Sequence, residues 1–249
     1  MLDIDFSRVR EIERLSKTGE HGAWRRGFLA QLRQQIEGVY SEINVDLRRN
    51  LADTGAAVSC IKGCTTCCDH FISIPVSHAM LITEHLYASN AAMENFKRNY
   101  LRWKQAFEDD LRAQNIITRL EMLTTFSDEI RPLPQGLLSA YHVLGIPCPF
   151  LDGKKCSIYP VRPICCAAYF AVSPLEFCRV DSAVPATIME IRPAEASLRR
   201  MSQLTDPRLS WHQEPLPDIV YKLLTRGLLD VAEEVFKLFD SGASAPPEA

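Results

Sequence analysis

Four of the nine cysteines in this 249-residue chain lie within one short run, Cys60-Ile-Lys-Gly-Cys64-Thr-Thr-Cys67-Cys68. Core packing does not explain such a density of thiols. A cysteine buried alone behaves as a small hydrophobic residue, whereas several thiolates at short offsets are soft ligands that converge on a metal. The run therefore predicts a metal or cluster site, around which the rest of the chain is organised.

The composition predicts one folded domain, at 1–240, followed by a small, proline-containing tail at 241–249 that we expect to be disordered. Hydrophobic residues make up 47% of the chain, which is enough for one core. The net charge is -3 and the basic residues are scattered, so neither feature favours nucleic-acid binding. No apolar run has the length of a signal peptide or a membrane span, so we expect a cytoplasmic protein without a membrane partner. In that reducing compartment an odd cysteine count favours metal or redox sites over disulfides.

Helical periodicity predicts a mainly α fold. Apolar residues at steps of three and four indicate an N-terminal helix at 22–51, a helical insert at 91–126 and a C-terminal helix at 218–239. The aromatic stripe of the insert is typical of a core-facing helix, so we interpret it as core rather than as a cofactor site. Long amphipathic helices should therefore frame the cysteine region.

The segment between residues 131 and 193 has a different composition, because its nine prolines forbid long helices. Irregular chain of this length is uncommon in a compact domain unless it carries function or is held by a cross-link. Between the two cysteine-rich segments we expect a short strand at 71–75 and a helix over 79–87 with Ser77 as its N-cap. The proline-rich segment contains the remaining cysteines: Cys148, Cys156, Cys165, Cys166 and Cys178.

These motifs resemble a known family. Three motifs carry the resemblance: the first cysteine run, Cys148-Pro-Phe-Leu, and Cys156-Ser-Ile-Tyr-Pro-Val-Arg-Pro-Ile-Cys-Cys166. They are similar to motifs of the YkgJ-type cysteine-cluster family. That family is described as zinc- or iron-chelating and includes the flagellin lysine N-methylases. The resemblance covers about 60–178 without the helical insert. It leaves Cys165 at a variable position, and Ala167 stands where the family often has arginine. The resemblance implies eight metal ligands: Cys60, Cys64, Cys67, Cys68, Cys148, Cys156, Cys166 and Cys178.

Eight ligands would make two four-cysteine sites. Neighbouring side chains diverge in extended or turning backbone, so we expect Cys67 and Cys68 to face different sites. For the same reason we expect Cys165 to point away from Cys166 in a non-helical segment and to remain an ordinary thiol. If each site takes ligands from both cysteine-rich segments, metal binding becomes part of folding.

The cysteine spacing favours an iron-sulfur cluster, with zinc as the alternative. Paired Cys-x2-Cys motifs are typical of zinc sites, and only Cys64 and Cys67 form one here. The first three cysteines also have the spacing of radical S-adenosylmethionine enzymes, but those enzymes use a barrel of strands and helices that this chain does not predict. We expect an iron-sulfur protein, an oxidoreductase or a modifying enzyme, that acts on a protein or small-molecule substrate. The alternative is a zinc-stapled interaction module without catalysis.

Four further side chains are candidates for supporting roles. Tyr159 and Arg162 lie between two expected ligands, where they could donate hydrogen bonds toward sulfur and offset thiolate charge, and we assign them to cofactor binding. Packing of the Tyr-Pro-x-Arg-Pro turn explains them equally well. His70 and Asp69 follow the first run directly and could act as a ligand or in acid-base chemistry, although a histidine there is more often a hydrogen-bonding neighbour.

Overall fold

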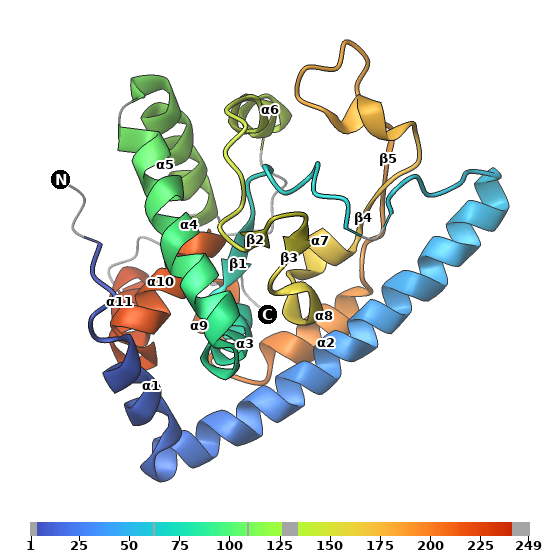
Figure 1. The fold of residues 1–249 in the computed structure, drawn as a ribbon. Helices are drawn as coiled ribbons and strands as arrows, with labels where there is room; N and C mark the ends of the chain where they lie inside the picture. Colours follow the sequence, from blue (N-terminus) through green and yellow to red (C-terminus); the bar gives the residue numbers. More distant parts are fainter. Residues whose placement is uncertain (1–3, 62, 109, 126–133, 241–249) are drawn as a thin grey trace.

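The computed structural model describes residues 4–61, 63–108, 110–125 and 134–240. Over these residues the protein is mainly α, as predicted (Figure 1). Its helices are α1 (Val9–Lys17), α2 (Gly19–Thr54), α3 (Val76–Ala88), α4 (Asn90–Glu108), α5 (Leu111–Thr125), α6 (Gln135–Val143), α7 (Ile164–Ala167), α8 (Glu195–Ser202), α9 (Pro207–Trp211), α10 (Leu216–Thr225) and α11 (Leu228–Asp240). The predicted tail at 241–249 lies outside the described residues.

The strands are short and pair in antiparallel twos. β1 (Ser73–Pro75) pairs with β6 (Gln213–Pro215), β2 (Leu151–Asp152) with β3 (Lys155–Cys156), and β4 (Tyr169–Ala171) with β5 (Ile188–Glu190). Two 3-10 turns, η1 (Tyr159–Val161) and η2 (Leu175–Cys178), complete the proline-rich segment. Within the described part of that segment the longest helix has nine residues, which confirms the prediction that prolines exclude long helices.

Helix α2 runs along one side of the molecule and packs against both the helical core and the segments that carry the cysteines (Figure 1). Leu32 and Ile36 belong to the main hydrophobic core. Further along the same stripe, Val39 and Ile43 pack in a second, smaller cluster under the cysteine region, together with Ala167, Ala168 and Ile191. The helix ends at Gly55, which adopts φ +67° and donates its N–H to the carbonyl of Leu51 (3.0 Å). The predicted N-terminal helix is thus confirmed and extends a few residues further at both ends.

Two predicted helices are each split in two. The insert is α4 followed by α5, because the Asp110 carboxylate accepts hydrogen bonds from the N–H groups of Arg112 (2.8 Å) and Ala113 (3.3 Å) and so starts a new helix. The C-terminal helix is α10 followed by α11, with Gly227 at φ +89° between them. In both places the helix is interrupted, at a capping carboxylate or at a glycine, although the apolar period continues through the break.

The aromatic stripe of α4 is core, as predicted, because Phe96, Tyr100 and Trp103 are buried. The prediction that Ser77 caps α3 is wrong. The helix begins at Val76 after Pro75, so Ser77 lies buried in its first turn. Pro75 ends strand β1 with extended backbone (φ -71°, ψ 157°), and the chain becomes helical at the next residue without a side-chain cap.

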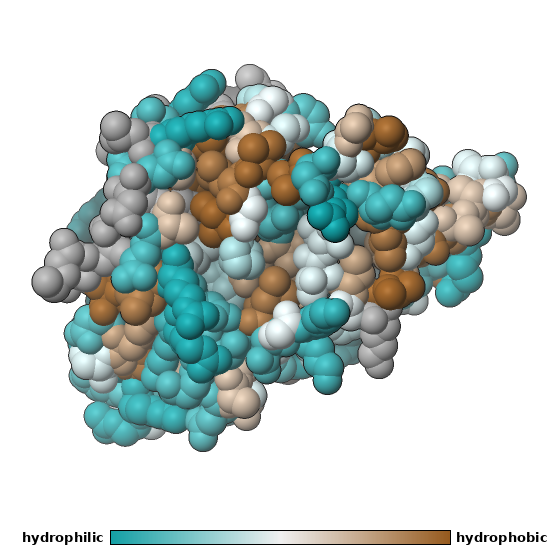
Figure 2. All heavy atoms as spheres, turned by 45° about the horizontal axis from the view of Figure 1, so that its top comes forward, coloured by the Kyte–Doolittle hydropathy of each residue, from teal (hydrophilic) through white to brown (hydrophobic). Residues whose placement is uncertain are grey.

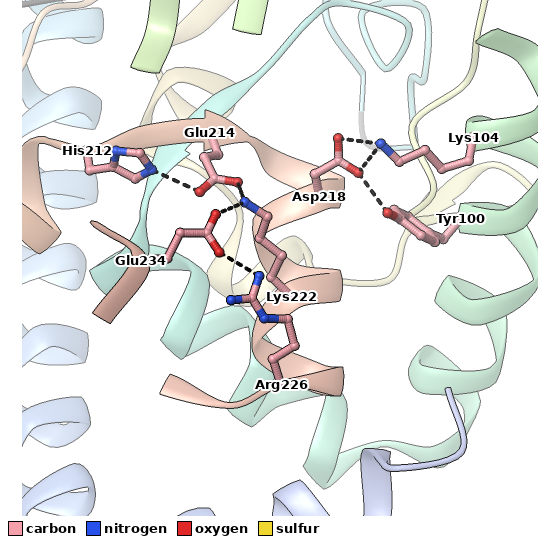
Figure 3. A network of polar contacts seen from close by, with 8 residues as sticks. All are labelled: Tyr100, Lys104, His212, Glu214, Asp218, Lys222, Arg226 and Glu234. Carbon is pink, nitrogen blue, oxygen red and sulfur yellow. Dashed lines mark hydrogen bonds and ion pairs between the residues drawn. The ribbon is translucent and has the colours of Figure 1, made fainter. Parts of the chain in front are cut away.

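A network of polar contacts joins β6, α10 and α11 (Figure 3). Glu214 accepts a hydrogen bond from His212 (2.9 Å) and pairs with Lys222 (2.8 Å). Lys222 also pairs with Glu234 of α11 (2.8 Å), which contacts Arg226 (2.6 Å). Because each charge has a partner of opposite sign, the network offsets the cost of burying these groups, and its role is structural.

Asp218 forms the second part of the network, between α10 and α4 (Figure 3). Its carboxylate accepts a hydrogen bond from the Tyr100 hydroxyl (2.7 Å) and pairs with Lys104 (2.8 Å).

None of the described helices combines the length and the apolar character needed to cross a membrane.

Candidate metal centre

The first cysteine run is held against β4 and the β2–β3 hairpin. Ser59 donates its N–H to the carbonyl of Ala171 (2.8 Å), and Ala171 donates its own N–H to the Cys60 sulfur (3.2 Å). Gly63 adopts φ +89°, and a side chain there would lie 3.5 Å from the Lys154 carbonyl oxygen. That distance is an ordinary contact, but L side chains rarely adopt this positive φ, so glycine lets the run turn here.

The second set of cysteines meets the first run through the backbone. The Cys148 N–H donates to the Cys68 carbonyl (2.6 Å), although the two residues are far apart in sequence. The β2–β3 hairpin then places Cys156 opposite Leu151. Cys148 and Cys156 are half-buried and pack against the main core. The two cysteine-rich segments thus lie side by side.

Both cysteine doublets differ from the expectation that neighbouring thiols diverge. Cys67 and Cys68 lie in a tight turn, and the hydrogen bond from Cys68 lowers the pKa of Cys67 to about 6. Cys165 and Cys166 lie in helix α7, not in a non-helical segment, and their hydrogen bond lowers the pKa of Cys165 and raises that of Cys166. In each doublet the two thiols lie within hydrogen-bonding reach of each other, so the expectation that they point apart is wrong.

One group of cysteines surrounds the 3-10 turn η2. Burial raises the pKa of Cys178, and the neighbouring thiols of Cys60, Cys64 and Cys67 raise it further. Cys60, Cys64 and Cys67 therefore each lie within electrostatic reach of Cys178, which follows them by more than one hundred residues in sequence.

A second set of cysteines also approaches the Cys67–Cys68 turn. Burial raises the pKa of Cys148 to about 12, and the thiols of Cys156 and Cys67 add to the effect. The pKa of Cys68 is raised by its hydrogen bond to Cys67 and by burial, with further contributions from Cys67, Cys148 and Cys156. Cys166 has Cys148 among its neighbours as well. Cys67 thus stands between the two groups.

The sulfurs within each group are spread apart. All nine cysteines are free thiols. Over the described ranges, which include every cysteine, no three cysteine sulfurs lie within 4.8 Å of one another. The arrangement brings all eight expected ligands to one region, around the Cys67–Cys68 turn.

The two residues assigned to cofactor binding lie beside this region. The Arg162 guanidinium stacks 4.3 Å above the ring of Tyr159, which is 53% exposed. Burial raises the pKa of Cys156, and the Arg162 charge acts in the opposite direction, so Arg162 is close enough to offset thiolate charge. The Tyr40 hydroxyl of α2 donates to the Arg162 carbonyl and fixes the backbone there.

Two histidines of α3 hold the segment between Cys156 and Cys166. His78 is buried and donates from Nε2 to the Val161 carbonyl (3.3 Å), and His85 donates from Nε2 to the Ser157 carbonyl (2.8 Å). Burial lowers the pKa of His78 to about 4, so it is neutral near pH 7. These histidines orient the cysteine region from the helical core.

Sequence patterns did not point to His142. It lies on α6, 73 residues after Asp69, and its Nδ1 is 2.9 Å from the Asp69 carboxylate. No motif surrounds it, so no local signal could have joined it to the first run.

In this mainly α protein two cysteine-rich segments meet on one side of a helical core. This arrangement is that of a cysteine-ligated metal-binding protein. Residues 59–183, half of the chain, match the family model "CxxCxxCC: Putative zinc- or iron-chelating domain". The chain belongs to this family. The resemblance to a cysteine-cluster family is thereby confirmed, and membership supports cysteine-ligated binding of zinc or iron. No curated protein and no solved structure matches the chain.

Proposed function

We propose that the protein holds two iron-sulfur centres and uses them in redox chemistry or in cluster-dependent modification of another molecule, which is a protein or a small-molecule substrate. The ligands of the first centre are Cys60, Cys64, Cys67 and Cys178. The ligands of the second are Cys68, Cys148, Cys156 and Cys166. Each centre draws on both cysteine-rich segments, as the contacts of Cys60 with Ala171 and of Cys148 with Cys68 support.

The observation that carries this proposal is the spread of the sulfurs. Four thiolates bound to one zinc ion at about 2.3 Å have sulfurs about 3.8 Å apart. In a cluster with four irons each thiolate binds its own iron, so the sulfurs stand farther apart. Among the described residues no three cysteine sulfurs lie within 4.8 Å of one another. This spacing fits the ligands of an iron-sulfur cluster better than the four closely spaced ligands of one zinc ion.

An iron-sulfur cluster supplies one-electron transfer, and its potential depends on charge, hydrogen bonds to sulfur and exposure. The chain's own residues set these conditions. Arg162 offsets thiolate charge near Cys156, and the Ala171 N–H donates to the Cys60 sulfur. The hydrogen bond from Cys68 lowers the pKa of Cys67 and so favours the thiolate form that binds metal. Nine free cysteines suit a reducing compartment, which supports a cytoplasmic location.

A zinc-stapled interaction module is the second candidate. Figure 2 shows hydrophobic side chains gathered between hydrophilic ones on the face that carries the cysteine region. Among the described residues, the exposed large hydrophobic side chains in or next to this region are Ile61, Val143, Tyr159, Val180 and Val184. Exposed apolar side chains of this kind favour contact with another macromolecule.

Anaerobic purification followed by iron, sulfide and zinc analysis separates the two candidates. We expect iron and acid-labile sulfide, with broad visible charge-transfer absorption that bleaches on reduction. Zinc has a filled d shell and no redox chemistry, so a colourless protein with stoichiometric zinc and no iron would refute the iron-sulfur proposal.

Variants of one cysteine from each group test the ligand assignment. Cys178→Ala should remove the first centre and keep the second, and Cys156→Ala should do the reverse. Loss of both centres in both variants would mean that all eight cysteines form one centre. Unchanged metal content in either variant would remove that cysteine from the ligand set.

A further inference from the structure

Besides the cysteines, the structure brings together three other side chains with metal-binding atoms: Asp69, His70 and His142. The Asp69 Oδ1 atom lies 3.2 Å from Nδ1 of His70 and 2.9 Å from Nδ1 of His142. The two imidazole rings are inclined at 47° with their centroids 4.4 Å apart. One potential ligand atom from each residue lies within 4.8 Å of the other two.

The backbone holds this cluster from both sides. Asp69 and His70 complete the turn after Cys68, where the His70 N–H donates to the Cys67 carbonyl (3.3 Å). His142 lies in the last turn of α6, and its carbonyl accepts from the N–H of Gly145 (2.9 Å). The chain then continues to Cys148, whose backbone N–H donates a hydrogen bond to the Cys68 carbonyl. Two fixed segments therefore present the three side chains to one point.

The separations match those of ligands around one ion. A nitrogen or oxygen ligand lies about 2.1 Å from a zinc-sized ion, so two ligands subtending a right angle are about 3.0 Å apart and two at a tetrahedral angle about 3.4 Å. The two separations from Asp69 fall at or near this range, and one nitrogen of each histidine lies within 4.8 Å of one nitrogen of the other.

The donor set also defines the class of ion. Imidazole nitrogens suit zinc, iron, cobalt and nickel, whereas calcium and magnesium require mostly oxygen ligands. The three side chains are between 19% and 33% exposed, so the point they share is partly shielded yet open to solvent. The ring of Tyr169 packs edge-on against His70, with centroids 5.6 Å apart, and limits its rotation.

We propose that Asp69, His70 and His142 bind one divalent transition-metal ion, separate from the cysteine centres. Two histidines and one carboxylate leave coordination positions free for water or for a substrate oxygen or nitrogen. The ion lies directly beside the Cys67–Cys68 turn, because Asp69 and His70 continue the same backbone. A substrate bound to this ion would stand next to the cysteine centres.

Cobalt(II) is the probe that tests the site, because its visible bands report its ligands. It is titrated anaerobically into the full-length protein after the cysteine centres have been filled. We expect one further equivalent to bind with weak ligand-field bands and without additional thiolate-to-metal charge transfer. In the proton NMR spectrum of this protein we expect two strongly shifted exchangeable signals from the Nε2–H groups of two imidazoles bound through Nδ1.

A pair of histidine variants supplies the matched comparison. His142→Ala should weaken cobalt binding by more than about tenfold, since even loss of a group that only orients a ligand costs that much. His21→Ala, on α2 and stacked on Trp24, should bind cobalt as the unaltered protein does. Both variants should keep the metal content of the cysteine centres.

Three results would overturn the proposal: no further equivalent of cobalt in the unaltered protein, no shifted imidazole signals, or equal binding in His142→Ala. The NMR measurement needs no variant, so it decides the question even if His142→Ala fails to fold. Zinc in place of iron at the cysteines would refute the proposed function and leave this result unchanged, so the two failures are distinguishable.

Discussion

The helical region, formed by α1 to α5, α10 and α11, and the cysteine region, formed by 56–70 and 144–191, are built on different principles. The helical region contains most of the fully buried large side chains, such as Phe96, Leu120 and Ile82. In the cysteine region every described element has at most four residues, and the described residues of 56–70 include no buried hydrophobic side chain, although 144–191 contributes Phe150, Ile158 and Val161 to the main core. We therefore expect hydrophobic burial to offset most of the conformational entropy of the first region, and metal coordination to supply a larger share in the second.

The largest expected effect is that of removing the metal. Chelation under reducing conditions should abolish hydrogen-exchange protection in 56–70 and 164–183 while α3, α4 and α10 keep theirs, because structural metal sites contribute folding free energy directly. Helical circular dichroism should fall only in part, since α7 is the one helix of the cysteine region. Equal protection of both regions with and without metal would show that the comparison is wrong.

Next in size is the loss of one centre on removal of one ligand. Cys166→Ala should lose the second centre, whereas Cys165→Ala should keep full metal content and cost at most about 1 kcal/mol, the scale of an exposed or minor side-chain change. The two residues are neighbours in α7, so each serves as the control for the other. Metal per chain is measured after anaerobic purification. Equal loss in both variants would make Cys165 a ligand.

The third prediction concerns a substitution in the helical region, where we expect a loss of stability without a loss of metal. Phe96 is fully buried and stacks on Phe150, with centroids 4.7 Å apart. Phe96→Ala should lower the free energy of unfolding by about 3–5 kcal/mol. Although the cavity borders Phe150, two residues after the expected ligand Cys148, metal per folded chain should stay unchanged, because we expect metal coordination to hold that segment in place. Urea unfolding followed by circular dichroism, with metal analysis of the folded fraction, measures both quantities; a proportionate loss of metal would mean that the two regions fold as one.

The smallest effect comes from His78, which connects the two regions. Its pKa falls to about 4 on folding from an ordinary value of 6.5, because burial disfavours the charged ring. Below pH 6.5 the unfolded chain therefore binds a proton that the folded protein does not, and stability falls as the pH decreases from 6.5 to 4, by at most about 1.4 kcal/mol per pH unit.

The control for His78 is His78→Gln, whose amide can still donate to Val161 but does not titrate. The difference in unfolding free energy between pH 7 and pH 5 should be smaller in this variant than in the unaltered protein. An identical pH dependence in the two proteins would show that His78 is not buried as a neutral ring.

Sequence reasoning predicted the helical region well and its boundaries less well. The stripe of α2 and the buried aromatic residues of α4 follow from a period that is local to each helix. The breaks at Asp110 and Gly227 were missed because the apolar period continues through them, although a capping carboxylate and a glycine are recognisable signals. The start of α3 was misplaced because Ser77 has the residue type of a cap but not its position.

The kind of site was determined by the sequence itself. Cysteine number and spacing indicate thiolate coordination of zinc or iron, because ligand chemistry depends on residue type. The proline content likewise excluded long helices around the second set of cysteines, because proline removes a backbone donor at any position.

Only the tertiary structure decided which side chains meet. The approach of the first cysteine run to Cys178 and to Cys148 depends on contacts between segments far apart in the sequence. The approach of His142 to Asp69 crosses 73 residues and has no sequence signal. Helical periods reflect interactions between near neighbours in the chain, whereas a metal site is assembled from residues that loop closure and packing bring together.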